Sequence, residues 1–170
     1  MHPATLRRLG PDDLADYRHI RLTALATAPD AFTSTYDAEA ARPDVEHIER
    51  LLTSSVFGAY LDGRIVGMLG CRRYDSARET HKAFLWGFYV EPFHRQSGLA
   101  GLLIEASLDT VPAGVEQILL TVVTTNHPAI SLYKRFGFRP YGTEPRSLKS
   151  AGFYADEHLM VLFLSDRRSP

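Results

Sequence analysis

The sequence lacks cysteine pairs, long apolar runs and an excess of either charge. Cys71 is the only cysteine among 170 residues, so no disulfide can form within the chain, and zinc sites that need two cysteines are excluded. No run of about 18 apolar residues occurs, and the N-terminal stretch MHPATLRRLG does not have the apolar core of a signal peptide. We therefore expect a cytoplasmic protein with no bound metal and no membrane partner.

The charge balance argues against a polyanionic partner. Lysine and arginine total 19 and aspartate and glutamate total 20, which leaves a formal net charge of −1. Such a chain has no global field that attracts nucleic acid, so we expect no nucleic-acid partner. A content of 45% hydrophobic and 23% charged residues is ordinary for a globular protein. We predict a single domain over residues 1–170, with a flexible tail at 165–170.

The N-terminal third predicts one strand and two helices. Residues 4–9 predict a strand, and the Gly-Pro-Asp sequence that follows predicts a helix ending near Thr27. The polar residues 32–41 predict a loop. A second helix begins near Pro43, because proline suits the first helical turn. Its apolar residues recur at helical spacing and predict the buried face, which would hold Val45, Ile48 and Leu52.

The middle of the chain predicts a β-meander followed by a helix. Asp62-Gly63 lies between two apolar segments, the strongest short-range signal for a β-hairpin. Residues 84–90 predict a buried strand that Pro92 ends. The apolar period then changes to that of a helix over residues 98–111.

The C-terminal third predicts one central strand, one helix and two further strands. Residues 117–124 predict a strand that follows a helix, so its pairing can be parallel. A helix begins near Pro128 and ends at Gly137. Further along, we predict a short strand at 138–142, a loop at 143–152 and a strand at 154–164. The order βααβββαβαββ predicts an α/β (α+β) fold, with a mixed, mostly antiparallel sheet of six to seven strands flanked by about four helices.

The strongest functional signal is the turn between the strand at 84–90 and the helix that follows it. Its sequence is Arg-Gln-Ser-Gly-Leu-Ala, with the glycine at position 98. Glycine lets a ligand approach the backbone closely, and the unpaired N–H groups and dipole at a helix start favour an anion. We interpret this segment as a phosphate-binding turn.

Two motifs together resemble the GNAT superfamily of acetyl-CoA-dependent N-acetyltransferases. Val90 followed by Arg95-x-x-Gly98-x-Ala100 is similar to the Arg/Gln-x-x-Gly-x-Gly/Ala turn of that family. The segment VTTNHPAISLYKRFGF matches the second motif, with Asn126 and Tyr133 ahead of Gly-Phe. The chain departs from the family pattern at Gln96, where many members have glycine, and at Ala100. The strand at 84–90 also lacks the glutamate that several members carry there.

The resemblance implies acetyl-CoA as the co-substrate. The N–H groups of residues 96–101 would hold the pyrophosphate with Arg95 close by, and the pantetheine would pair with the backbone of residues 88–90. Gly87 is the candidate for a bulge at which this strand leaves its neighbour. Asn126 resembles the residue that bonds the cofactor or the acceptor, although a helix cap explains it equally well. The implied cofactor-binding residues are Phe88, Tyr89, Val90, Arg95, Gln96, Ser97, Gly98, Leu99, Ala100, Gly101 and Asn126.

The reaction needs an uncharged amine, stabilisation of an oxyanion and an acid that protonates the departing thiolate. Tyr133 resembles the family's acid, and a phenol with an ordinary pKa near 10 is protonated at neutral pH. The other interpretation of Tyr133 is a core aromatic residue, since it shares a helix face with Leu132 and Phe136. No spacing selects the general base. The candidates are Glu79, His81, Glu91, Asp156, Glu157 and His158.

Two classes of function stay open. The first is an N-acetyltransferase that acts on a primary amine, on a small molecule, peptide or protein, by direct attack in a ternary complex. Cys71 lacks the signature of an activated nucleophile, which disfavours an acyl-enzyme. The second is a non-catalytic acyl-CoA-binding sensor or partner module. A different nucleotide-binding fold is disfavoured because no GK[ST] motif follows the glycines. An exposed edge at the last strand would allow a homodimer.

Overall fold

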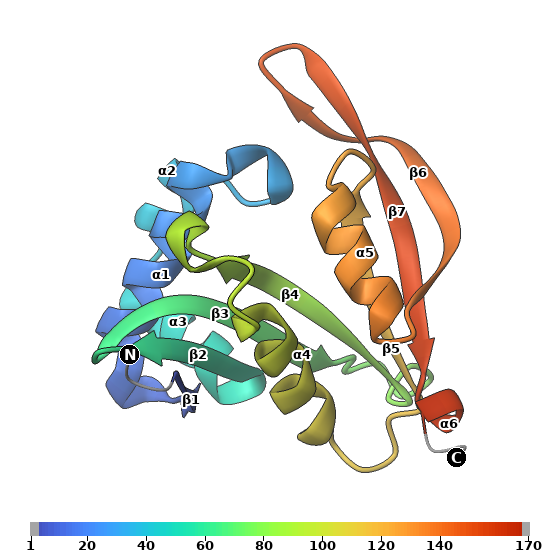
Figure 1. Ribbon diagram of the computed structural model, residues 1–170, viewed down its shortest axis with the longest axis horizontal. Coiled ribbons are helices and arrows are strands. Elements are labelled where there is room, and N and C mark those ends of the chain that lie inside the picture. Colours follow the sequence, from blue (N-terminus) through green and yellow to red (C-terminus); the bar gives the residue numbers. More distant parts are fainter. Residues whose placement is uncertain (1–3, 168–170) are drawn as a thin grey trace. The chain divides into compact units, whose positions relative to one another are not determined.

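The structure is a computed structural model that describes residues 4–167 (Figure 1). Its strands form a seven-stranded sheet in the order β1-β2-β3-β4-β5-β7-β6. The ladder between β4 and β5 is parallel, whereas β1–β2, β2–β3, β5–β7 and β6–β7 are antiparallel. The strands are β1 Thr5–Leu9, β2 Ser55–Leu61, β3 Arg64–Arg73, β4 Lys82–Val90, β5 Gln117–Val123, β6 Arg139–Ser150 and β7 Phe153–Phe163.

Six α-helices accompany the sheet within residues 4–167. Four of them correspond to the helices predicted from the sequence, and the short helices α2 and α6 were not predicted. This arrangement confirms the α/β class and the mixed, mostly antiparallel sheet. The helices are α1 Leu14–Thr27, α2 Tyr36–Ala40, α3 Asp44–Thr53, α4 Leu99–Asp109, α5 His127–Arg135 and α6 Leu164–Arg167.

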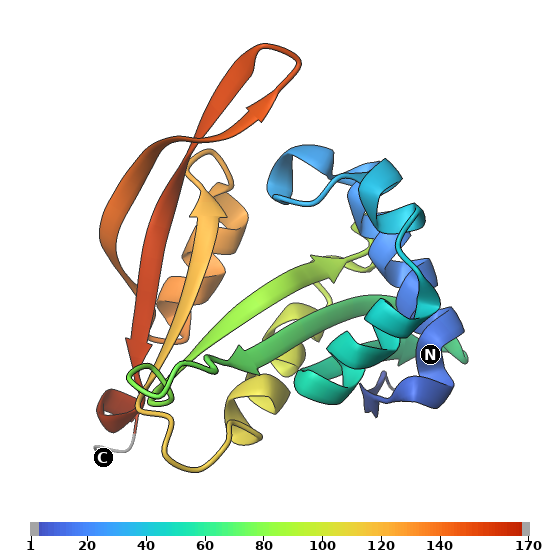
Figure 2. The same cartoon turned by 180° about the vertical axis from the view of Figure 1, so that it is seen from behind.

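The chain divides into two units. Unit 1 comprises Met1–Arg72 and Leu85–Val111, and unit 2 comprises Arg73–Phe84 and Pro112–Pro170, so the division falls within β4. In unit 1, α1 and α3 lie on one face of strands β2 to β4 and α4 lies on the other (Figures 1 and 2). In unit 2, α5 lies along β5, and β6 and β7 form a long hairpin. The single domain stays a prediction.

Local sequence signals placed several elements correctly. Asp62 and Gly63 both have positive φ, +49° and +78°, and they join β2 to β3 in the predicted hairpin. Lys82 at the start of β4 pairs with Gln117 of β5 in the parallel ladder that the intervening helix predicts. Gly137 has φ +91° and follows the end of α5, as a helix C-terminus often requires.

The buried face of α3 was predicted wrongly. Val45 and Leu52 are 68% and 66% exposed. The helix instead buries Leu51 and His47, so its inward face is rotated by about one residue. The segment predicted as the loop 32–41 contains helix α2, which Thr35 caps by accepting a hydrogen bond from Ala38 N. Leu51 joins a core cluster with Tyr17 and Ile20 of α1, and the His47 ring meets the Tyr17 ring, so packing against α1 decides which face of α3 is buried.

The C-terminal strands also differ from the prediction. The expected loop at 143–152 is mostly strand, because β6 continues to Ser150 through an irregular stretch between Glu144 and Leu148. Arg146 has φ +54° in this stretch, and its N–H donates to Asp156 Oδ1 at 2.7 Å. The last strand, β7, lies between β5 and β6, so it is not an edge strand as predicted; the edge strands of the sheet are β1 and β6. Residues 165–167, expected in a loose tail, belong to α6, and residues 168–170 lie outside the described residues.

Candidate active site

The predicted phosphate-binding turn is exposed and opens directly into helix α4. Gln96 and Gly98 have positive φ of +62° and +87°, and Ser97 Oγ donates to the carbonyl of His94 at 2.6 Å. Leu102 N donates to Gly98 O at 3.2 Å as the first bond of the helix. The N–H groups of the three residues before Leu102 therefore have no partner within the helix. The turn thus supplies several backbone donors at the positive end of a helix dipole.

Arg95 and Gly98 shape this turn for an anion. Arg95 Nε donates to the carbonyl of Val90 at 3.0 Å, which ties the guanidinium to the end of β4. A Cβ placed on Gly98 would meet nothing within 4 Å, so the space beside the backbone is open. An open backbone, a helix start and an anchored cation fit a pyrophosphate. The structure therefore brings together the predicted residues 95–101, all in unit 1.

The last two residues of β4 before the turn have buried side chains. Tyr89 and Val90 are buried, and the Tyr89 hydroxyl hydrogen-bonds Thr27 Oγ1 of α1 at 2.7 Å. Gly87 has φ +66°, a departure from extended geometry that fits the predicted bulge. Phe88 is half-buried, and the contact of the backbone of residues 88–90 with a donor substrate stays a prediction.

Unit 2 holds the two other predicted site residues, Tyr133 and Asn126. Tyr133 of α5 is 6% exposed, and its ring meets Phe138 edge-on at 5.8 Å between centroids. Burial raises the pKa of Tyr133 above its ordinary value, so the phenol keeps its proton and can donate it. Asn126 caps α5, since its Oδ1 accepts from Ala129 N at 3.3 Å. The side-chain oxygen of Asn126 thus acts as a helix cap, one of the two roles considered for this residue.

The candidate bases differ in burial, and Glu157 is the one that is buried. Glu157 of β7 is 6% exposed, and Ser147 Oγ donates to its Oε2 at 2.6 Å. Within the described residues, no cation lies within ion-pair distance of this carboxylate. The other candidates are more exposed, and most have a hydrogen-bond or ion-pair partner, as in Glu79–Lys82, Glu91–Arg64, Asp156–Arg146 and His158–Thr143.

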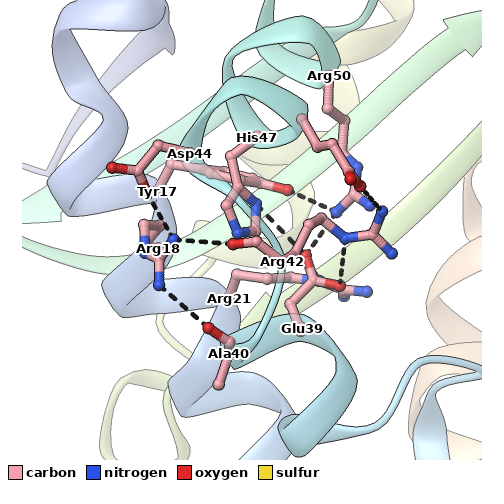
Figure 3. A network of polar contacts seen from close by, with 10 residues as sticks. Tyr17, Arg18, Arg21, Glu39, Ala40, Arg42, Asp44, His47 and Arg50 are labelled. Atoms are coloured by element: carbon pink, nitrogen blue, oxygen red, sulfur yellow. Dashed lines mark hydrogen bonds and ion pairs between the residues drawn. The ribbon is translucent and has the colours of Figure 1, made fainter.

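A polar cluster around Glu39 in unit 1 was not predicted from the sequence (Figure 3). Glu39 of α2 is 1% exposed, and its Oε1 accepts from Arg50 Nη1 at 2.6 Å. Arg50 Nη1 also donates to the Tyr17 hydroxyl at 2.9 Å. The buried side chains of Arg21 and His47 face the same carboxylate, at 3.6 and 3.7 Å. No spacing in the sequence signals this cluster, because its members come from three helices.

Burial and charge act in opposite directions in this Glu39 cluster. Burial favours the neutral acid of Glu39, but the guanidinium groups of Arg21 and Arg50 outweigh it and lower its pKa. Burial lowers the pKa of His47, which Glu39 only partly offsets, so this imidazole is neutral at pH 7. Burial also raises the pKa of Tyr17. The charges that remain are therefore those of the carboxylate and the guanidinium groups.

Residues 4–167 contain no group of three or more His, Cys, Asp or Glu side chains arranged to hold a metal ion. None of the helices described is long and apolar enough to cross a bilayer.

Comparison with known proteins assigns the family. The model of the acetyltransferase (GNAT) family matches residues 12–138. The chain belongs to this family. Among curated GNAT relatives, the L-amino acid N-acetyltransferase AaaT of Escherichia coli strain K12 is 32% identical over 105 residues, 61% of this chain and 64% of AaaT. The N-alpha-acetyltransferase of Sulfolobus acidocaldarius is 35% identical over 124 residues, 66% of this chain and 68% of that protein. This chain thus matches just under two thirds of the length of AaaT.

Solved structures of the GNAT family share the fold. The acetyltransferase of the GNAT family from Streptococcus pneumoniae has a TM-score of 0.83 at 23% identity, covering 95% of this chain and 99% of that chain. The yncA structure from Salmonella typhimurium, solved with its cofactor acetyl-CoA, has a TM-score of 0.82 at 19% identity, covering 99% of this chain and 98% of that chain.

Proposed function

We propose that this chain transfers an acetyl group from acetyl-CoA to a primary amine by direct attack within a ternary complex. The observation that carries the proposal is the exposed turn at residues 95–98, whose backbone donors and anchored arginine suit the pyrophosphate of coenzyme A. The names of the two curated relatives refer to amino acids and to N-alpha acetylation. Both names fit an α-amino group as the acceptor.

The residues of unit 1 would hold the donor. Acetyl-CoA supplies the activated acyl group as a thioester when it is bound. The N–H groups of residues 96–101 would bind the pyrophosphate, and the guanidinium of Arg95 would offset its charge. The backbone of residues 88–90 would orient the pantetheine arm. These groups bind and position, and they take no part in proton transfer.

Tyr133 supports the proposal as the acid. Burial raises the pKa of its phenol above the ordinary value, so the group is protonated at neutral pH and can donate a proton to a departing thiolate. The state of Cys71 supports direct attack. Burial raises the pKa of the Cys71 thiol to about 12, and a neutral thiol is a poor nucleophile. An acyl-enzyme at Cys71 is therefore disfavoured.

Glu157 supports the proposal as the group that takes the proton from the acceptor ammonium. It pairs with Val123 at the end of β5, and Asn126 N donates to the carbonyl of the same valine at 2.9 Å. Glu157 therefore lies close to the start of α5, the helix that carries Tyr133. A buried carboxylate without a cationic partner favours an ammonium beside it and can accept its proton.

A thiol-release assay with acetyl-CoA tests the function against a panel of amines, amino acids and peptides. We expect turnover with α-amines and a fall in kcat of about tenfold or more in Tyr133→Phe, with the affinity for acetyl-CoA unchanged. Tyr141→Phe is the control, since Tyr141 is an exposed tyrosine of the same unit. Tight binding of acetyl-CoA without turnover on any acceptor would instead support the sensor or partner module.

The role of Glu157 has a separate test. Glu157→Gln keeps the size of the side chain and removes the base, so we expect a large loss of kcat/KM at pH 7 that is partly recovered at alkaline pH, where the free amine is abundant. Glu144→Gln is the matched control, because Glu144 is the exposed cross-strand partner of Glu157 on β6. Equal pH profiles in wild type and Glu157→Gln would remove Glu157 from the mechanism.

A further inference from the structure

The charge of Arg21 is only partly neutralised by the described residues. Arg21 is 5% exposed. Its Nε lies 3.6 Å from Glu39 Oε1, too far for a hydrogen bond. Nε and Nη1 of Arg21 make no hydrogen bond. The short contact of Glu39 goes instead to Arg50. Buried guanidinium nitrogens without an acceptor are costly, which points to a missing anion.

The buried charges of the Glu39 cluster include more cations than anions. Arg21 and Arg50 share the single carboxylate of Glu39. Because His47 and Tyr17 are neutral at pH 7, they add no charge. The remaining cations of the cluster have carboxylates of their own, in the pairs Arg18–Asp44 and Arg42–Glu46. One positive charge among the buried groups is therefore left without a counter-ion, and an incoming anion would balance it.

Two aromatic rings flank the Arg21 guanidinium. Its Cζ lies 5.4 Å from the ring centroid of Phe32 and 6.0 Å from that of Trp86, and Arg50 lies 5.4 Å from the Trp86 ring. Both rings are half-buried. Ring faces hold a planar guanidinium in place without neutralising it, and they leave its N–H edge for an acceptor. A carboxylate matches that planar donor edge.

The Arg21 guanidinium lies beside β4, the strand along which the donor would bind. A Cβ placed on Gly87 would lie 3.6 Å from Nη1 of Arg21, so the guanidinium lies against the backbone of β4. The pyrophosphate would lie at residues 96–101 and the pantetheine along residues 88–90. The acyl end of the donor would therefore lie toward Gly87, away from the phosphates. A second substrate that approaches this end would meet Arg21.

We propose that Arg21, supported by Arg50, binds the α-carboxylate of a free amino acid whose α-amine accepts the acetyl group. This inference rests on the proposed function and narrows its acceptor. A free amino acid carries its carboxylate one carbon from its amine, so one molecule can meet the Arg21 charge and present its amine near Gly87. A polypeptide N-terminus carries a neutral amide at that place and leaves the charge unbalanced.

The test uses three acceptors with the same side chain: leucine, leucinamide and 3-methylbutylamine. The wild-type protein prefers leucine by kcat/KM. Arg21→Met raises KM for leucine at least about tenfold and leaves KM for 3-methylbutylamine within about twofold. Arg42→Met is the matched control, because it removes a guanidinium at the margin of the same cluster, 3.9 Å from Glu39. It leaves the preference for leucine unchanged.

Folding and function are read separately in this test. The variant Arg21→Gln keeps a polar side chain and leaves the Glu39–Arg50 pair intact, so it replaces Arg21→Met if that protein does not fold. A thermal-shift titration with leucine and with 3-methylbutylamine, in the presence of coenzyme A, reports binding without turnover. If leucine stabilises the wild type and this stabilisation is lost in the Arg21 variant, the carboxylate site is supported, whether or not leucine is acetylated. If no acceptor is acetylated, the proposed function is overturned and the carboxylate site is not. Turnover with equal kcat/KM for the three acceptors overturns the carboxylate site alone.

Discussion

At the scale of single residues, Glu39 is the anion on which the polar cluster of unit 1 depends. Glu39→Gln leaves Arg21 and Arg50 without their shared carboxylate. Breaking a buried pair by removing one partner costs about 3–5 kcal/mol, so we expect the free energy of unfolding to fall by about this amount. Urea unfolding measures the change. Glu46→Gln removes an exposed carboxylate of the same cluster and is expected to cost less than about 1 kcal/mol. Equal costs for the two variants would mean that Glu39 does not hold the cluster.

His47 predicts how stability depends on pH. Its pKa is lowered in the folded protein, mainly by burial and further by Arg18, Arg42 and Arg50, against the opposing effect of Glu39. The unfolded chain therefore binds a proton at His47 at a higher pH than the folded chain does. The stability due to neutral His47 is complete above the unfolded pKa of about 6.5 and is lost as the pH falls through the folded pKa.

We expect the urea midpoint to fall between about pH 7.5 and about pH 5.5, and His47→Leu to reduce this dependence. His127→Leu, at an exposed histidine of α5, serves as the control and keeps the wild-type slope. Glu39 adds a second loss at lower pH, because its folded pKa is also lowered. An unchanged slope in His47→Leu would show that other groups account for the titration.

At the scale of elements, the start of α4 tests the donor turn. Gly98 has φ +87° and open space around its Cβ position, so alanine there pays a backbone cost and no packing cost. We expect Gly98→Ala to lower the free energy of unfolding by about 1–2 kcal/mol and to weaken acetyl-CoA binding. Gly10→Ala is the control, because Gly10 has a negative φ and equally open surroundings. Thermal unfolding and a coenzyme A titration read the two effects.

The start of α5 separates the two interpretations of Asn126. Asn126→Ala removes the cap and is expected to cost about 1 kcal/mol of stability. Asn126→Asp keeps an oxygen for Ala129 N and should restore that stability. If the amide of Asn126 also bonds the cofactor or the acceptor, Asn126→Asp will still have a raised KM for acetyl-CoA or for the acceptor amine. Wild-type kinetics in Asn126→Asp would limit Asn126 to capping.

At the scale of the whole molecule, the single predicted domain can be tested through the two units. Trp86 is the only tryptophan and belongs to unit 1, so its fluorescence reports that unit, whereas far-UV circular dichroism reports both. Because β4 contributes residues to each unit, we expect the two urea transitions to coincide. Separate midpoints would show that the units unfold independently and would contradict a single cooperative domain.

The sequence by itself determined the fold class, the hairpin at Asp62-Gly63 and the glycine-containing turn before α4, and it allowed the parallel pairing of β5. These features rest on local signals: apolar periodicity, glycine at positive φ and the chemistry of a helix start. Local patterns could not place the buried face of α3 or the strand at 143–150, because propensity is overridden where tertiary contacts form.

Only the tertiary structure decided how the charged residues are used. Arg21, Glu39 and Arg50 are ordinary polar residues in the sequence, and they become a buried cluster because α1, α2 and α3 bring them together. Glu157 was one of six equivalent candidates until pairing within the sheet buried it beside Ser147 and away from any described cation. Burial changes the meaning of a charge through desolvation, and desolvation depends on neighbours that are distant along the chain.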